Sequence, residues 1–216
     1  MKETIKKSRE EHIILHAQKV FFNKGYSNAA ISDVCKSADC SRTTLYTYFE
    51  TKENLYLAVV KGTFNKFLSH FAQLDLEGKK GLDRVLTLAI GYLEFAGSHP
   101  QYYQEILNFY GLLWSINEKA VQTETQSKIK NSANFEDAKA LAQLPLKLLA
   151  SEIQKGQEDG SIQKRTSPQI HMMNIWAYLK GISDLSPIIK NLSPSSGDKL
   201  DLTETVTRII RTMFKS

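Results

Sequence analysis

Hydroxyl, guanidinium and ammonium groups gather between residues 41 and 52, in the stretch Ser-Arg-Thr-Thr-Leu-Tyr-Thr-Tyr-Phe-Glu-Thr-Lys. If this stretch is helical, its outer face presents Arg42, Thr43, Thr44 and Thr47, whose polar side chains are rich in hydrogen-bond donors. Donors of this kind suit the edges of bases and the oxygens of phosphates. The pattern therefore predicts a surface that contacts nucleic acid.

Two tyrosines and a lysine extend this surface. Tyr46 and Tyr48 carry hydroxyl groups on rigid arms that suit phosphate contacts. Lys52 lies where the next helix is expected to begin, so its charge and the free backbone N–H groups can hold a phosphate together. The full predicted DNA-contact set is Ser32, Ser41, Arg42, Thr43, Thr44, Tyr46, Thr47, Tyr48 and Lys52.

Short helices must position these side chains. We expect a first helix over residues 31–38, a turn at Asp39 and Cys40, and a second helix over residues 42–48. The first helix braces the second through Val34 and Ala38. Ser41 is placed to cap the second helix, and Thr51 the one after it. Two short helices joined by such a turn can place the second in a DNA major groove. We therefore expect a helix-turn-helix at residues 30–49.

Helical periodicity continues along the rest of the chain. Apolar residues at helical spacing predict a first helix over residues 6–24 that ends before Gly25, and no alternating apolar pattern predicts a strand. Later helices are expected at residues 52–74, 82–98, 101–117, 135–155, 168–190 and 199–214, with a linker at residues 77–81. The fold class is all-α. We expect a DNA-binding domain at residues 1–51 and a larger helical domain at residues 52–216.

Composition sets broad limits. With 216 residues, 42% of them hydrophobic and 24% charged, the chain has ample material for a core. No apolar run is long enough to cross a bilayer, and the N-terminal residues lack the apolar segment of a secretory signal. Two cysteines are too few for a disulfide framework, which favours a reducing, cytoplasmic location.

Net charge gives little support for nucleic-acid binding. Residues 1–60 hold nine Lys and Arg against seven Asp and Glu, a net of +2 out of the +5 of the whole chain. The positive charge is thus not concentrated around the predicted helix-turn-helix. The prediction depends on residue pattern.

That pattern resembles the DNA-binding segment of the TetR/AcrR family of regulators over residues 13–55. The resemblance is carried above all by the run Ser-x-x-Thr-Leu-Tyr-x-Tyr-Phe-x-x-Lys-Glu from Ser41 to Glu53. The other matching positions are Ile13, Ile14, Ala17, Val20, Phe21, Gly25, Tyr26, Asp33, Val34, Ala38 and Leu55. The resemblance implies a bacterial transcriptional regulator, a repressor that binds a palindromic operator as a homodimer and is released by a small-molecule effector.

Four positions depart from the family pattern. Ala30 stands where Thr or Ser is usual, which should weaken the cap of the first short helix by roughly 1 kcal/mol. Asp39 replaces a common Gly in the turn, and Asp tolerates a left-handed conformation better than most residues. Thr43 replaces a common Gly, and His16 a common Ala. These changes bear on the operator that is read.

The resemblance also implies a dimer interface and an effector pocket in the larger domain. The two last helices would form a four-helix bundle with their counterparts through Ile175, Leu179, Ile182, Val206, Ile209, Ile210 and Met213. Aromatic residues favour a lipophilic or aromatic effector, and the pocket candidates are Phe67, Phe95, Tyr103, Phe109, Tyr110, Trp114 and Trp176. Either set could instead form the core of the subunit.

Other kinds of site have weaker support. His12 and His16 have the spacing of two metal ligands, but no third ligand is evident, so we expect no metal. Cys35 and Cys40 would act as a redox switch only if accessible, and buried thiols are the alternative. No catalytic or cofactor motif is found, so we expect neither an enzyme nor a cofactor. A TetR-like protein that organises DNA or binds a protein partner remains the alternative function.

Overall fold

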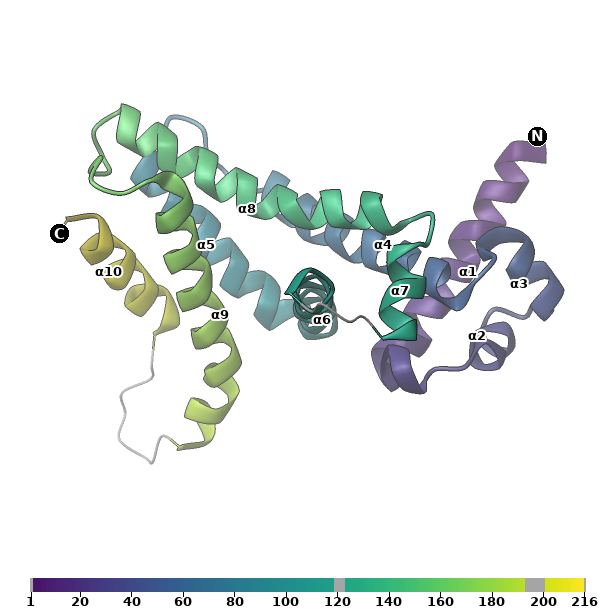
Figure 1. Ribbon diagram of the computed structural model, residues 1–216. Helices are drawn as coiled ribbons and strands as arrows, with labels where there is room; N and C mark the ends of the chain where they lie inside the picture. Colours follow the sequence, from purple (N-terminus) through teal and green to yellow (C-terminus); the bar gives the residue numbers. More distant parts are fainter. Residues whose placement is uncertain (1, 119–122, 193–200, 216) are drawn as a thin grey trace. The chain divides into compact units, whose positions relative to one another are not determined.

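The computed structural model describes residues 2–118, 123–192 and 201–215, and over these residues it contains helices and no strand (Figure 1). The all-α prediction is confirmed. The helices are α1 (Lys2–Asn28), α2 (Ile31–Ser37), α3 (Arg42–Phe49), α4 (Lys52–Ala72), α5 (Gly81–Ser98), α6 (Pro100–Glu118), α7 (Glu124–Lys130), α8 (Phe135–Glu158), α9 (Pro168–Leu192) and α10 (Leu202–Lys215). Among these helices, none has the length and apolar character that crossing a bilayer demands.

The chain folds as two compact units. The first consists of Met1–Lys66 and Gln101–Ala142, and the second of Phe67–Pro100 and Gln143–Ser216. The predicted domain boundary at residues 51 and 52 coincides with the start of α4. The units divide the chain differently, because α6, α7 and the beginning of α8 belong with the helix-turn-helix in the first unit.

The first unit contains α1, α2, α3 and the beginning of α4 (Figure 1). Ile13, Ala17 and Phe21 form the buried face of α1. Gly25 interrupts this helix with φ 72° and ψ 158°, a backbone conformation that glycine adopts readily and residues with a Cβ disfavour. The predicted break at Gly25 is therefore present, although helical backbone resumes as far as Asn28.

Helix α7 is the main element that the sequence analysis missed. A capping box starts it: Gln126 N donates to Thr123 Oγ1 (3.2 Å), and Thr123 N donates to Gln126 Oε1 (2.8 Å). The Thr-x-x-Gln spacing was the available signal. Ile129 is buried, whereas the surrounding residues of this short helix are mostly exposed, so its apolar periodicity is weak.

In the second unit, the turn after α8 caps the start of α5. Gly81 N donates to Asp159 Oδ2 (2.7 Å), and Leu82 N donates to Ser161 Oγ (3.0 Å). A Cβ at Gly81 would overlap the backbone of Gly156, so the two glycines permit this close approach. Gly81, predicted to end a linker, is instead the buried first residue of α5.

A buried ion pair reinforces the same contact. Glu152 on α8 is 2% exposed and accepts hydrogen bonds from Arg84 Nε on α5 and from Lys155 Nζ. Burial on its own would raise the pKa of Glu152, but the hydrogen bonds from Arg84 and Lys155 outweigh it and lower that pKa. Glu152 is therefore ionised inside the protein, with Arg84 as its main partner and Lys155 as a more exposed second one.

The remaining helix boundaries agree with the prediction to within a few residues. His99 separates α5 from α6, and Pro100 is the first residue of α6, a position that proline tolerates. The last helix was predicted to begin at residue 199, which lies outside the described residues; α10 is described from Leu202. In the second unit α10 contacts α5, and Arg211 Nη2 bonds Asp83 Oδ1 (3.1 Å).

Candidate nucleic-acid interface

A tight turn sets the two short helices of the helix-turn-helix. Asp39 adopts φ 45°, the left-handed conformation predicted for it, and Cys40 N donates to Cys35 O (3.1 Å) across the turn. Leu45 and Phe49 are fully buried and anchor α3. The opposite face of α3 is therefore held toward solvent.

The start of α3 is capped as predicted. Ser41 Oγ accepts from Thr44 N (3.0 Å) and also shares a hydrogen bond with Thr44 Oγ1 (2.9 Å). Ala30 provides no such bond to α2, but Asp33 Oδ2 accepts from Ala30 N (3.0 Å) and forms an ion pair with Lys24. The lost cap is thus partly replaced by a carboxylate at the positive end of α2.

The predicted DNA-contact residues lie mostly on the exposed face of α3. Arg42, Thr43, Tyr46 and Thr47 are exposed, whereas Thr44 and Tyr48 are half-buried. Thr47 Oγ1 donates to Thr43 O (2.8 Å) within the helix. Within the described part of the chain, the Arg42 guanidinium and the Tyr46 hydroxyl have no hydrogen-bond partner, so both are free for an external ligand. Ser32 is exposed on α2, one residue after its start.

Three side chains of α1 hold the turn of the helix-turn-helix. Arg9 Nη2 donates to Asp39 O (2.9 Å), His12 Nε2 bonds Ala38 O (3.1 Å), and His16 Nδ1 bonds Ser37 Oγ (2.8 Å). The pKa of His16 is lowered by burial and then by its neighbour His12. The histidines thus brace the C-terminal end of α2, and the described residues contain no cluster of three metal-ligating side chains.

The two cysteines lie inside this region as free thiols. Cys35 is buried and Cys40 is half-buried. Burial raises the pKa of the Cys40 thiol, and a hydrogen bond with Cys35 and that neighbour's charge raise it further. Because the thiolate is the reactive form, this environment favours a structural role over a redox role.

Lys52 lies at the first position of α4, as predicted for a phosphate contact. Its Nζ lies 4.4 Å from the ring centroid of Tyr26, and the Tyr26 hydroxyl donates to Glu53 Oε1 (2.9 Å). Burial lowers the pKa of Lys52. The ring of Tyr26 therefore holds the ammonium in one place at the positive end of the helix.

The first turns of α4 are joined to three other parts of the first unit. Tyr56 packs against Tyr26 of α1, with ring centroids 4.6 Å apart, and its hydroxyl donates to Glu105 on α6. Asn54 bonds Asn134, which precedes α8. No role was predicted from the sequence for Tyr56, Glu105, Asn54 or Asn134, because their partners are distant in the chain.

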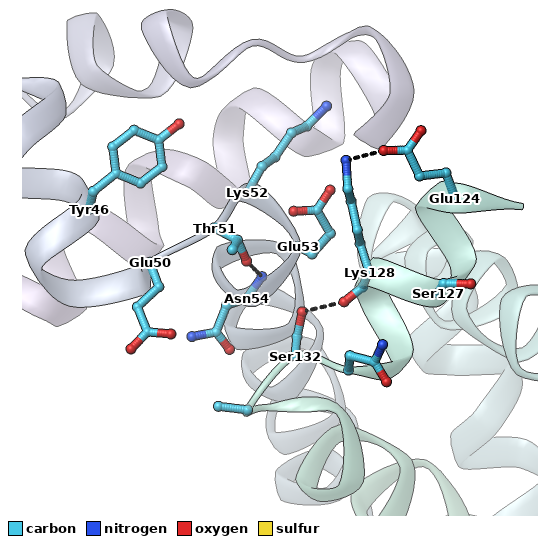
Figure 2. A pocket seen from close by; sticks show the side chains of 12 residues that line it. Tyr46, Glu50, Thr51, Lys52, Glu53, Asn54, Glu124, Ser127, Lys128 and Ser132 are labelled. Atoms are coloured by element: carbon cyan, nitrogen blue, oxygen red, sulfur yellow. Dashed lines mark hydrogen bonds and ion pairs between the residues drawn. The ribbon is translucent and has the colours of Figure 1, made fainter.

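A polar cleft of about 710 Å³ separates the α3–α4 junction from α7 (Figure 2). Tyr46, Glu50 and Lys52 lie on one side, and Lys128, which is paired with Glu124, lies on the other. Its remaining lining residues are Thr51, Glu53, Asn54, Ser127, Asn131, Ser132 and Ala133. The cleft brings residues of the predicted DNA surface next to the unpredicted helix α7.

The predicted effector-pocket residues lie in separate clusters. Phe67 and Phe95 are buried together in the second unit, while Phe109 and Tyr110 pack on Phe64 in the first. Tyr103 is buried, and Trp114 is 64% exposed. Trp176 alone of the seven lines the small apolar cavity described within the second unit, together with Phe71, Leu88, Ala89, Tyr92, Pro145, Leu149 and Leu179.

The predicted interface residues divide into two groups. Ile175, Leu179, Val206 and Ile210 are at most 2% exposed and belong to the core of the second unit. Their side chains are thus covered within the subunit, which is the alternative that the sequence left open. Ile182, Ile209 and Met213 are partly exposed. Among the described side chains of α9, Ile170, Met173, Leu185 and Ile188 are more than half exposed.

Together, α2, the turn at Asp39 and α3 form a helix-turn-helix with an exposed polar face. Residues 13–59 match the family described as bacterial regulatory proteins, tetR family. The HTH-type transcriptional regulator QacR of Staphylococcus aureus is 25% identical over 123 residues, which cover 54% of this chain and 63% of QacR. The negative regulator IcaR of the biofilm operon in Staphylococcus epidermidis is 32% identical over 59 residues, 27% of this chain and 32% of IcaR.

Solved structures show the same fold over the whole chain. A TetR transcriptional regulator from Chloroflexus aurantiacus has a TM-score of 0.70 at 19% identity, covering 100% of this chain and 98% of that one. FadR from Bacillus subtilis, solved in complex with stearoyl-CoA, has a TM-score of 0.64 at 14% identity, covering 94% and 97%. The sequence matches are shorter, spanning 25% to 63% of the curated relatives' own lengths.

The family match covers residues 13–59, and beyond them the likeness to solved tetR-family structures is one of fold.

Proposed function

We propose that this chain represses transcription by binding a palindromic operator as a homodimer, and that a small apolar effector releases it. The observation that carries the proposal is the exposed face of α3, where Arg42 and Tyr46 have free donors and Ser41 fixes the helix start. Lys52, held over Tyr26, adds a cation at the start of α4. These groups supply base-edge and phosphate contacts from one rigid element.

The apolar surface of the second unit supports dimerisation. Ile170, Met173, Leu185 and Ile188 expose large side chains along α9. An apolar stripe of this kind on a regulator is suited to a second copy, since a palindromic operator requires two recognition helices roughly 34–36 Å apart. The partly exposed Ile182, Ile209 and Met213 complete the interface that we propose.

The effector site that we propose is the apolar cavity beside Trp176. Its volume is about 10 Å³, so an effector must widen it. Aromatic and aliphatic walls suit a lipophilic molecule, and the related fold of FadR was solved with stearoyl-CoA. If the widened form binds operator less well, then the effector must bind the DNA-bound protein less tightly by the same factor.

The decisive experiment is selection of duplexes from random DNA by the purified full chain. We expect one palindromic sequence to be enriched and bound by a dimer. A screen of lipophilic compounds should then find one that lowers operator affinity, and operator should lower the affinity for that compound. Salt-sensitive binding without sequence preference would instead support a DNA-organising role, and equal compound affinity with and without operator would exclude the proposed coupling.

A further inference from the structure

We propose that Asn134 is a positioning residue for DNA binding, because it holds the first turn of α4, and with it Lys52, through Asn54. The inference rests on the DNA-binding function proposed above. Asn134 lies 80 residues from Asn54 in the chain, immediately before α8. Neither residue belongs to the predicted DNA-contact set.

Three hydrogen bonds join the two asparagines. Asn134 N donates to Asn54 Oδ1 (3.1 Å), while Asn134 Nδ2 donates to Asn54 O (3.2 Å) and to Asn54 Oδ1 (2.8 Å). Asn54 is 9% exposed. A buried amide with this many bonds ties two elements together firmly, since each lost bond would leave a polar group without a partner.

The direction of these bonds is fixed by the backbone atoms. Asn134 N can only donate and Asn54 O can only accept, so Asn54 must present its amide oxygen and Asn134 its amide nitrogen. Lys61 Nζ donates to Asn134 Oδ1 (3.0 Å), which requires the same orientation. Lys61 also pairs with Asp137 in the first turn of α8, at 2.8 Å. In this contact Asn134 is therefore the donor and Asn54 the acceptor.

The side chain of Asn134 forms hydrogen bonds with another helix, α4, instead of capping its own helix, α8. Ala138 N donates to Asn134 O (3.0 Å), which places Asn134 at the cap position of α8. An asparagine there usually bonds its own helix with its side-chain oxygen. Among the described residues, the side chain of Asn134 bonds Asn54 and Lys61 on α4 only.

The turn held in this way carries the predicted phosphate contact. Asn54 N donates to Thr51 Oγ1 (3.0 Å), which caps α4, and Lys52 is the first residue of the helix. Figure 2 shows Asn54 at the side of the cleft that Thr51 and Lys52 share, facing the segment with Ser132. A phosphate at a helix start needs the backbone N–H groups and the lysine in one geometry. Asn134 supplies the external support for that geometry.

Two matched variants test the inference. Asn54→Asp and Asn134→Asp each add one negative charge at the same contact, so their direct repulsion of DNA is similar. In Asn54→Asp a carboxylate still accepts from both Asn134 donors. In Asn134→Asp the side-chain donor is lost, and a carboxylate faces the Asn54 carbonyl. The probe is the duplex that the unmodified chain selects from random DNA.

We expect Asn134→Asp to bind this duplex about tenfold more weakly than Asn54→Asp, with a slope of log K against log salt that is smaller by about one. In a Lys52→Met background, Asn134→Asp should cause no further change in slope, because the phosphate contact is already lost. A role in stability alone would leave the salt slope unchanged. Melting temperature and sedimentation show whether each variant is a folded dimer. If Asn134→Asp is not a folded dimer, then Asn134→Ala repeats the comparison without an added charge.

Equal affinities and slopes for the two aspartate variants, or an unchanged effect of Asn134→Asp in the Lys52→Met background, would overturn the inference. If the unmodified chain selects no duplex, then the proposed function itself fails, and the inference with it. These two failures are distinct, because the second is seen before any variant is made.

Discussion

The hydroxyl of Tyr56 on α4 donates a 2.5 Å hydrogen bond to Oε1 of Glu105 on α6, inside the first unit. Both residues are at most 5% exposed. Burial is the largest cause that raises the pKa of each group, and Asn108 adds a second, longer bond to Glu105 at 3.4 Å. The pair joins the helix that begins with Lys52 to a helix that is distant in sequence.

Replacing Glu105 with glutamine should alter the pH dependence of stability. Because the folded-state pKa of Glu105 is raised, its favourable contribution is present below the ordinary pKa and is lost as the pH rises through the raised value. Glu105→Gln does not titrate at this position. The variant should therefore gain free energy of unfolding relative to the parent as the pH rises above the ordinary pKa of a glutamate, by about 1.4 kcal/mol for each unit of raised pKa. Urea denaturation measures this, and a difference that does not change with pH would contradict it.

Gly81→Ala should destabilise the second unit strongly. The added Cβ would overlap backbone atoms of Gly156, and no side-chain rotation can relieve that overlap. We expect a loss of about 3 kcal/mol or more in free energy of unfolding. Gly97→Ala in the same helix is the matched control: a Cβ there meets nothing within 4 Å, and alanine should stabilise by about 0.5–1 kcal/mol. Similar thermal shifts for the two variants would argue against the described contact.

Arg84→Met should leave Glu152 without its main partner. A buried carboxylate deprived of a cation is costly, so we expect a loss of roughly 2–4 kcal/mol at neutral pH. Because the pKa of Glu152 is lowered, the stabilisation from its pairing is present above the ordinary pKa and lost as the pH falls. Lys155→Met, at the more exposed end, should cost less than about 1 kcal/mol. Chemical denaturation of both variants checks the order, and an equal loss would contradict it.

The cysteines should not act as an oxidant sensor. The raised pKa of the Cys40 thiol keeps little thiolate at neutral pH, so alkylation should be slower than for a free cysteine. Cys35→Ser and Cys40→Ser should keep their operator affinity, and mild peroxide should not release the parent protein from DNA. Release by peroxide that disappears in either variant would revive the redox interpretation.

Arg42→Ala and Tyr46→Phe should weaken operator binding without affecting dimerisation. Each removes a donor from the exposed face of α3, and we expect about 1–3 kcal/mol if Arg42 contacts a base edge. Fluorescence anisotropy measures the affinity, and sedimentation shows the dimer. Thr47→Val is a useful comparison, since the Thr47 hydroxyl already bonds Thr43 O in the free protein. Parental affinity in both Arg42→Ala and Tyr46→Phe would refute the assignment of this surface.

Local features of the fold were predictable from sequence because their causes are local. The cap at Ser41, the left-handed Asp39 and the break at Gly25 each depend on one residue and its immediate neighbours. Helix α7 was not predicted because its apolar periodicity is weak, although Thr123 and Gln126 have the spacing of a capping box.

Contacts between distant residues could not be predicted in this way. Asn54 with Asn134, and Arg84 with Glu152, meet only because helices pack together. The apolar stripes of the last two helices showed that they bury a face, but not what covers it. Hence Ile175 and Val206, expected at a dimer interface, lie in the core of the second unit.

If the small cavity beside Trp176 is the effector site, as proposed above, then the rate of effector entry depends on the motion of the protein. At about 10 Å³ the cavity holds no more than one water molecule. It must therefore widen by thermal motion before any organic effector can bind in it. The observed association rate should then level off at high effector concentration, at the rate of opening. Trp176→Leu should raise this limiting association rate and also the effector affinity, because widening the cavity would cost less free energy.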